Sequence, residues 1–127
     1  MERAEDALDS VSGVMRDVSG LSRALPGRVL TGEADLLTYA YDGSFQRERP
    51  EAVVLARGAD EVQAAVRWCL ENRVPYLARG AGTNLAGSCV PLRGGVVIST
   101  AAMDRVLTVD TRERTALVEP GVVNLKL

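Results

Sequence analysis

The sequence contains no histidine and only two cysteines. Because histidine is the commonest general base, its absence excludes a serine or cysteine catalytic triad of the usual composition. The two cysteines, Cys69 and Cys89, form no CxxC pair and belong to no cluster of metal-ligand residues. We therefore expect no metal site, and any chemistry has to come from a cofactor or from residues outside this chain.

Long apolar runs and an excess of one charge are also missing. No run approaches the roughly 20 apolar residues of a membrane-spanning helix, and the acidic start, MERAEDALDS, fits neither a secretory signal nor a transit peptide. The formal net charge is -2 and the isoelectric point about 5.2, so nothing favours nucleic acid or an anionic membrane as a partner. We expect a cytoplasmic protein.

What is present is the composition of a globular protein, with 46% hydrophobic and 25% charged residues among 127. A chain of this length can bury roughly two thirds of its unfolded surface and so build a core. We divide it at Pro50 into an N-terminal helical segment, residues 1–49, and an organised unit, residues 50–127. In the first part, apolar residues recur at three- and four-residue steps from Ala4 to Leu25, which predicts an amphipathic helix ended by Pro26 and Gly27. We expect this helix to pack on its own domain, with a dimer seam as the alternative.

The unit after Pro50 begins with a strand, a helix and a strand. The continuously apolar run 52–56 predicts a strand covered on both faces, and 75–78 predicts a second strand. Asp60 and Gln63 form a possible capping box for the helix between them. Such a unit implies a right-handed parallel crossover, and the helical spacing places Cys69 in the core rather than at a reactive site.

Later segments predict a third strand at 96–99 and a hairpin of residues 105–110 and 115–119 around the turn DTRER. Residues 124–127 predict the first turn of another element, so the chain looks cut short. The fold class that we expect is α+β: an N-terminal helix, short parallel strands with a crossover helix, and a hairpin.

The segment 79–88, RGAGTNLAGS, is the most informative part of the sequence. Its three glycines and small residues let successive backbone N–H groups point into one concavity, with few Cβ atoms to keep an anion away. Thr83, Asn84 and Ser88 add neutral donors, so the loop could hold a diphosphate without a lysine. The spacing matches neither GxGxxG nor GxxxxGK[ST], and a surface turn without a ligand remains the alternative.

Taken together, these pieces resemble one family. The order strand, capped helix, VPYLARGAGTNLAGS, GGVVIS, MDRVLTVD and VEPGV resembles the start of the FAD-binding domain of the p-cresol methylhydroxylase and vanillyl-alcohol oxidase superfamily. Within it, the glycolate oxidase subunit and D-lactate dehydrogenase group is most similar, because its members also carry a Tyr-x-x-Asp-x-Ser stretch like residues 39–44 here. The similarity covers most of the chain.

The resemblance implies a set of FAD-binding residues in the loop and in a later turn. They are Arg79, Gly80, Ala81, Gly82, Thr83, Asn84, Gly87, Ser88, Pro120, Gly121 and Val122. Relatives that attach flavin covalently from this loop have a histidine where Thr83 stands, so the resemblance implies non-covalent FAD. The family usually has a proline in place of Ala56, a departure that should alter the exit of the strand more than the cofactor contacts. For Arg79, a structural ion pair competes with a role as phosphate clamp.

The function implied is the N-terminal part of an FAD-dependent oxidoreductase that oxidises a 2-hydroxy acid of the D-lactate or glycolate type by hydride transfer to flavin. Catalytic residues are expected downstream, so none is assigned here, and the electron acceptor and a homo-oligomeric state stay open. The alternatives are an aldonolactone oxidase, an alkyl-dihydroxyacetone-phosphate synthase, an enolpyruvyl-glucosamine reductase or a non-catalytic fragment. Alone, the 127 residues should be inactive and bind FAD weakly or not at all, because half a site rarely compensates the ordering entropy of binding.

Overall fold

Four short strands form one mixed sheet in the computed structural model, which describes residues 16–126. The strands are β1 (Val29–Leu30), β2 (Ala52–Leu55), β3 (Tyr76–Arg79) and β4 (Val96–Ser99). Their order in the sheet is β1-β2-β4-β3, with β2 and β3 parallel to β4 and β1 antiparallel to β2. All four residues of β4 and three of β2 are buried, as the continuous apolar runs predict for strands covered on both faces.

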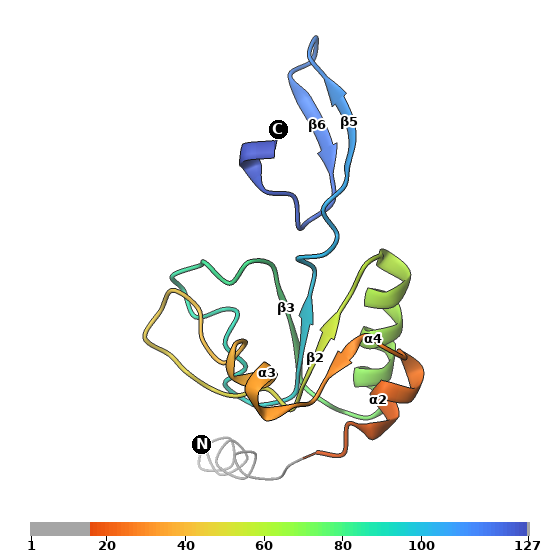
Figure 1. Ribbon diagram of the computed structural model, residues 1–127, viewed down its shortest axis with the longest axis vertical. Helices are drawn as coiled ribbons and strands as arrows, with labels where there is room; N and C mark the ends of the chain where they lie inside the picture. Colours follow the sequence, from red (N-terminus) through yellow and green to blue (C-terminus); the bar gives the residue numbers. More distant parts are fainter. Residues whose placement is uncertain (1–15, 127) are drawn as a thin grey trace, which may run out of the picture.

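Helices cover both faces of this sheet (Figure 1). The helices are α2 (Ser19–Ala24), α3 (Glu33–Leu37) and α4 (Ala59–Glu71). On one face, Leu21 of α2 and Cys69 of α4 belong to a core cluster with Val54, whereas Leu36 of α3 packs with Val53 on the other. Neighbouring residues of β2 thus reach opposite layers, because successive side chains of a strand point to opposite faces. The result is a three-layer arrangement of helices on both faces of a mixed, partly parallel sheet, which confirms the predicted fold class.

The predicted strands occur where the sequence places them, to within a residue or two at their ends. Helix α4 connects β2 to β3, but these two strands are not neighbours, since β4 lies between them. The division at Pro50 stays a prediction. Strand β1, which comes from the first segment, pairs with β2 through Val29 and Leu30.

The predicted capping box of α4 is wrong. The helix begins one residue earlier than Asp60, with Gly58 at the N-cap and no side-chain cap. Gly58 has an extended backbone, and its carbonyl accepts the Val62 N–H at 3.2 Å. Asp60 lies inside the first turn, where a carboxylate is favoured by the helix dipole instead of by a capping bond. The side chain in the first turn that binds a backbone N–H is Glu61, which accepts the Arg57 N–H at 2.8 Å.

The predicted N-terminal helix does not run through all of the described residues that it includes. Residues 16–18 are not helical, α2 starts at Ser19, and its last residue, Ala24, precedes the Pro26-Gly27 pair as expected. The part of the prediction before Arg16 lies outside the described residues. Leu21 and Leu25 are buried in the main core cluster, so this helix packs on its own domain as predicted.

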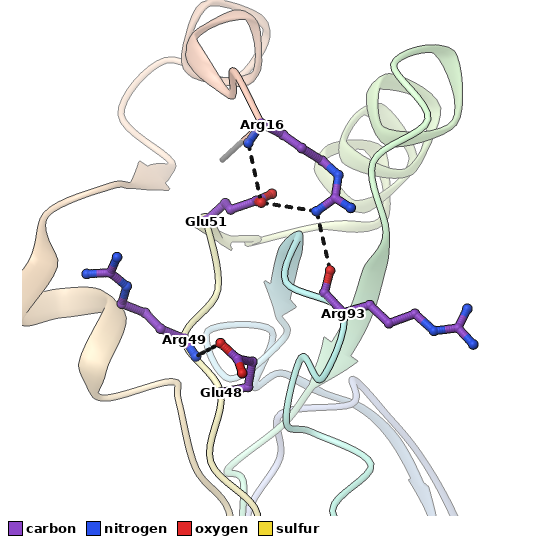
Figure 2. A network of polar contacts seen from close by, with 5 residues as sticks. All are labelled: Arg16, Glu48, Arg49, Glu51 and Arg93. Atoms are coloured by element: carbon purple, nitrogen blue, oxygen red, sulfur yellow. Dashed lines mark hydrogen bonds and ion pairs between the residues drawn. The ribbon is translucent and has the colours of Figure 1, made fainter. Parts of the chain in front are cut away.

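A polar network fixes the start of the described chain to the amino end of the sheet (Figure 2). The Glu51 Oε1 atom, just before β2, accepts from the Arg16 guanidinium at 3.0 Å, and the same guanidinium donates to the Arg93 carbonyl at 3.3 Å. Arg93 precedes β4, so the network links three segments at this end. The Arg93 side chain itself extends away from the network (Figure 2).

The hairpin of β5 (Val106–Asp110) and β6 (Thr115–Val118) forms a separate two-stranded sheet, as predicted. It lies beyond the carboxyl end of β4 and is followed by a short 3-10 turn at Asn124–Lys126 (Figure 1). At its base, Arg105 donates to Glu119 at 2.7 Å. None of the helices in residues 16–126 is both long and apolar enough to cross a membrane.

Candidate functional site

The glycine-rich loop leaves β3 at the carboxyl edge of the parallel strands. Ligand sites of open α/β sheets form at this edge, because the loops that follow the strands converge there. Within residues 16–126, no backbone N–H from Gly80 to Ser88 donates a hydrogen bond to a protein acceptor. The backbone of this segment only accepts: the Asn84 carbonyl accepts the Gly43 N–H at 2.9 Å, and the Gly87 carbonyl accepts the Val90 N–H at 3.1 Å. The amides that the sequence points to therefore remain available to a ligand.

Gly82 and Arg79 are fitted to one another. Gly82 has φ +71°, and a Cβ added there would overlap the Arg79 guanidinium. Arg79 is only 7% exposed, donates to the Tyr41 carbonyl at 2.6 Å and lies 5.4 Å from the centroid of the Tyr39 ring. In the described part of the chain Arg79 forms no ion pair, so it is not the structural ion-pair partner that the sequence suggested as one alternative. Its burial also shows that the side chain does not extend into solvent. A buried cation directly beside the loop favours an anion above it.

The other loop residues predicted to bind the cofactor differ in exposure. Gly80, Ala81, Thr83 and Ser88 are exposed, Gly82 and Asn84 are half-buried, and Gly87 is buried. No heavy atom lies within 4 Å of a Cβ built on Gly80, whereas Gly87 has φ +74° and lies against the Gln46 side chain. The exposed members leave the loop open on one side, as an approach by a ligand requires.

Asn84 carries an unpaired polar atom inside this loop. Its side-chain NH₂ donates to Asp42 at 3.0 Å and to Ser88 at 2.9 Å, but its Oδ1 atom is buried without a hydrogen-bond partner. A buried acceptor without a donor is costly, so it suits a ligand or water that brings a hydroxyl. FAD offers both groups that this loop lacks, since its diphosphate accepts from amides and its ribityl chain donates from hydroxyls.

The second predicted segment, Pro120 to Val122, meets the loop through Thr100 at the end of β4. The Thr100 N–H donates to the Arg79 carbonyl at 2.9 Å, and a Cβ on Gly121 would lie 2.5 Å from the Thr100 carbonyl oxygen. Only glycine permits this close approach. Pro120 is exposed, and Gly121 and Val122 are half-buried. Both predicted segments thus border the carboxyl end of the same strand.

A pocket of about 180 Å³ opens at the same edge of the sheet. Its lining includes Tyr39, Leu55, Arg57 and Ser99. Sites for drug-sized ligands usually measure roughly 300–1,000 Å³, so this pocket can take only a part of a dinucleotide. No group of three or more potential metal ligands occurs in residues 16–126.

The family assignment follows from comparison with known proteins. Residues 50–127, more than half of the chain, match the model of a family described as an FAD binding domain. The chain belongs to this family of FAD-binding domains. The match includes the loop and the turn described above, and the free amides, the buried arginine and the unpaired Asn84 oxygen fit such a cofactor.

Similar proteins place this FAD-binding domain in the p-cresol methylhydroxylase fold. It is 40% identical over 95 residues to the glycolate oxidase subunit GlcD of Bacillus subtilis (strain 168), covering 74% of this chain and 20% of that protein. It is 36% identical to GlcD of Escherichia coli (strain K12), covering 99% of this chain and 26% of that protein. A solved structure of p-cresol methylhydroxylase with substrate bound matches with a TM-score of 0.72 and 26% identity, over 94% of this chain and 23% of that one. The chain thus spans about a quarter or less of each relative.

Sequence reasoning missed how the segment 41–46 contacts the loop. Asp42 and Gly43 lie next to Asn84 through hydrogen bonds, although about 40 residues separate them in the sequence. The sequence pattern that contains these residues, Tyr-x-x-Asp-x-Ser, was recognised. Spacing within that segment, however, gives no information about its contact with the distant glycine-rich loop.

Proposed function

We propose that this domain is the N-terminal part of an FAD-dependent oxidoreductase that oxidises a 2-hydroxy acid of the glycolate or D-lactate type. The observation that carries the proposal is the row of unpaired amides from Gly80 to Ser88, within a chain of the FAD-binding domain family. The relatives named glycolate oxidase subunit support the substrate class. We further propose a cytoplasmic location.

In this proposal the loop holds the FAD diphosphate chiefly by neutral hydrogen bonds. The amides of Gly80 to Ser88 donate to the phosphoryl oxygens, and the Thr83 hydroxyl adds a donor. The buried guanidinium of Arg79 supplies positive charge below the loop without direct solvent screening. Pro120, Gly121 and Val122 line the cofactor from the other segment.

FAD, once bound, would accept the hydride that leaves the carbon bearing the substrate hydroxyl. The residues of this chain bind and orient the cofactor; the groups that hold the substrate carboxylate and take its hydroxyl proton belong to later parts of the protein. Thr83 carries no nucleophilic nitrogen, so we propose that FAD is held without a covalent bond.

A visible spectrum of the longest product of the gene tests this proposal. We expect a yellow protein with flavin absorbance that bleaches anaerobically on addition of D-lactate or glycolate, while L-lactate serves as the matched control. Precipitation with acid should release all flavin into the supernatant. A colourless protein that takes up no added FAD would contradict the cofactor assignment. A yellow protein that neither D-lactate nor glycolate bleaches would contradict only the substrate class.

A further inference from the structure

The segment 41–46 is fastened to the glycine-rich loop, and its carboxylate lies at the centre of the contact. One oxygen of Asp42 accepts the Asn84 NH₂ at 3.0 Å, and the other accepts the Ser44 N–H at 2.8 Å. Beside them the Gly43 N–H donates to the Asn84 carbonyl at 2.9 Å. The contact therefore engages both the side chain and the backbone of Asn84, in the middle of the loop.

The segment that supplies this carboxylate is itself held in shape. Tyr41 and Arg47 form an isolated antiparallel bridge, and the Arg47 guanidinium lies 5.2 Å from the centroid of the Tyr41 ring. The Tyr41 carbonyl accepts from the buried Arg79 side chain at 2.6 Å. Gly43 cannot be replaced without displacement, because an added Cβ would lie 2.8 Å from the Asn84 carbonyl oxygen. Asp42 thus belongs to an ordered segment that is hydrogen-bonded to Arg79 at the end of β3.

The charge of Asp42 is well satisfied although the residue is only 8% exposed. The Ser44 hydroxyl, and then the Ser44 and Cys89 N–H groups and the Asn84 amide, lower the pKa of this carboxyl against the opposing effect of burial. The carboxylate is therefore ionised at neutral pH. An anion next to a phosphate site weakens phosphate binding by simple repulsion, so its presence needs another reason.

We propose that Asp42 is a positioning residue that holds Asn84 and the loop 80–88 in the form that receives the diphosphate. By accepting from Asn84 Nδ2 it fixes the orientation of that side chain, whose buried Oδ1 atom lacks a protein partner. By binding the Ser44 N–H at the same time it fixes its own carboxylate within the segment 41–46. This proposal rests on the proposed function, since it names a residue that prepares the same site.

The variant Asp42→Asn tests the proposal, because it removes the charge with little change of shape. Asparagine can accept with one oxygen only, so its NH₂ group would face either the Asn84 NH₂ or the Ser44 N–H. If Asp42 merely repelled phosphate, the variant would bind FAD more tightly. If it positions the loop, we expect binding at least about tenfold weaker, as for loss of a hydrogen bond to a charged group.

The matched control is Asp110→Asn in the hairpin turn. Asp110 also accepts two backbone N–H groups, from Arg112 and Glu113 at 2.9 Å each, but it lies outside the loop and the segment 41–46. Three quantities are compared in the longest gene product: the FAD dissociation constant, the urea midpoint of the flavin-free form, and hydrogen exchange of the peptide covering 41–46, whose Gly43 N–H donates to the loop. A variant Ser44→Ala removes the Ser44 hydroxyl beside Asp42 and keeps the Ser44 N–H. It gives a milder change in the same direction if Asp42→Asn does not fold.

We expect Asp42→Asn to speed exchange of the Gly43 N–H and weaken FAD binding, with a urea midpoint no lower than that of Asp110→Asn. Unchanged exchange and affinity, tighter binding, or a loss of affinity that only follows a lowered midpoint would each overturn the proposal. Failure of the unaltered protein to bind FAD would instead contradict the proposed function, and exchange of the Gly43 N–H in the flavin-free form would still report whether Asp42 holds the loop against the segment 41–46.

Discussion

At the scale of residues, two glycines with nearly the same backbone angle have different surroundings. Gly27 has φ +70° and no heavy atom within 4 Å of an added Cβ, whereas Gly82 has φ +71° and the Arg79 guanidinium in that place. A Cβ at positive φ costs roughly 1–2 kcal/mol in either position. Only at Gly82 does the new atom also displace a buried cation.

We therefore predict that Gly82→Ala destabilises the fold more than Gly27→Ala, which should cost about 1–2 kcal/mol. The excess arises because Arg79 must leave the Tyr41 carbonyl. Urea denaturation of both variants measures the difference. Equal losses of stability would show that Arg79 does not depend on the space that Gly82 leaves.

The two thiols provide a second prediction at this scale. Cys69 is fully buried, and burial raises the pKa of its thiol to about 11, whereas Cys89 is half-buried. Because the thiolate is the reactive form, Cys69 should react with a disulfide reagent only as the protein unfolds. In the native protein we expect Cys89 to react first. Rapid native labelling of Cys69 would contradict its place in the core.

Arg79 shows what sequence could and could not predict about a single residue. Its position at the end of a strand and before the loop followed from the sequence. Its partners did not, because a carbonyl in the segment 39–41 and the Tyr39 ring are brought there by the fold. Neither interpretation weighed for it included a backbone carbonyl 38 residues away.

At the scale of elements, the strands were predictable because each is a short apolar run bounded by turn residues. Their order was not, since the insertion of β4 between β2 and β3 depends on pairing over long sequence distances. Strand β1 has two residues and so carries no periodic signal. The start of α4 was mispredicted because a side-chain cap was assumed, whereas the N-cap residue is Gly58, whose backbone carbonyl accepts the first hydrogen bond of the helix.

The base of the hairpin gives a pH prediction. The hydrogen bonds from the Arg105 side chain and N–H lower the pKa of Glu119 below its ordinary value of 4.5. A lowered folded-state pKa means that the pair stabilises the protein above about pH 4.5 and loses this effect as pH falls through the folded-state value.

Thermal unfolding of the unaltered protein and of Glu119→Gln between pH 7 and pH 3 measures this effect. The unaltered protein should be the more stable at pH 7, and the difference should shrink below pH 4.5. A difference that stays constant with pH would show that the charge of Glu119 does not matter.

At the scale of the whole molecule, the hairpin is the part that packs least against the rest of the described chain. Within residues 16–126 its two strands pair only with each other, and Leu107, Val109 and Leu117 are exposed on it. A two-stranded ribbon is marginally stable in water, whereas the four-stranded sheet is buried between helices. The chain therefore combines a firm α/β layer with a less stable projection.

Limited digestion with trypsin should reflect this difference. Arg112 and Arg114 lie in the exposed turn of the hairpin, and Arg67 is also exposed but belongs to α4. We expect cleavage at the turn well before cleavage at Arg67, because proteolysis requires local unfolding. Simultaneous cleavage at both places would contradict the difference in stability.

The central claim is that the amides between Gly80 and Ser88 bind the diphosphate of FAD. Hydrogen exchange of the longest gene product, compared with and without FAD, tests it most directly. The account predicts that FAD slows exchange most strongly in the peptide covering these residues, with a smaller effect at 120–122. Bound FAD that leaves the exchange of residues 80–88 unchanged would contradict it.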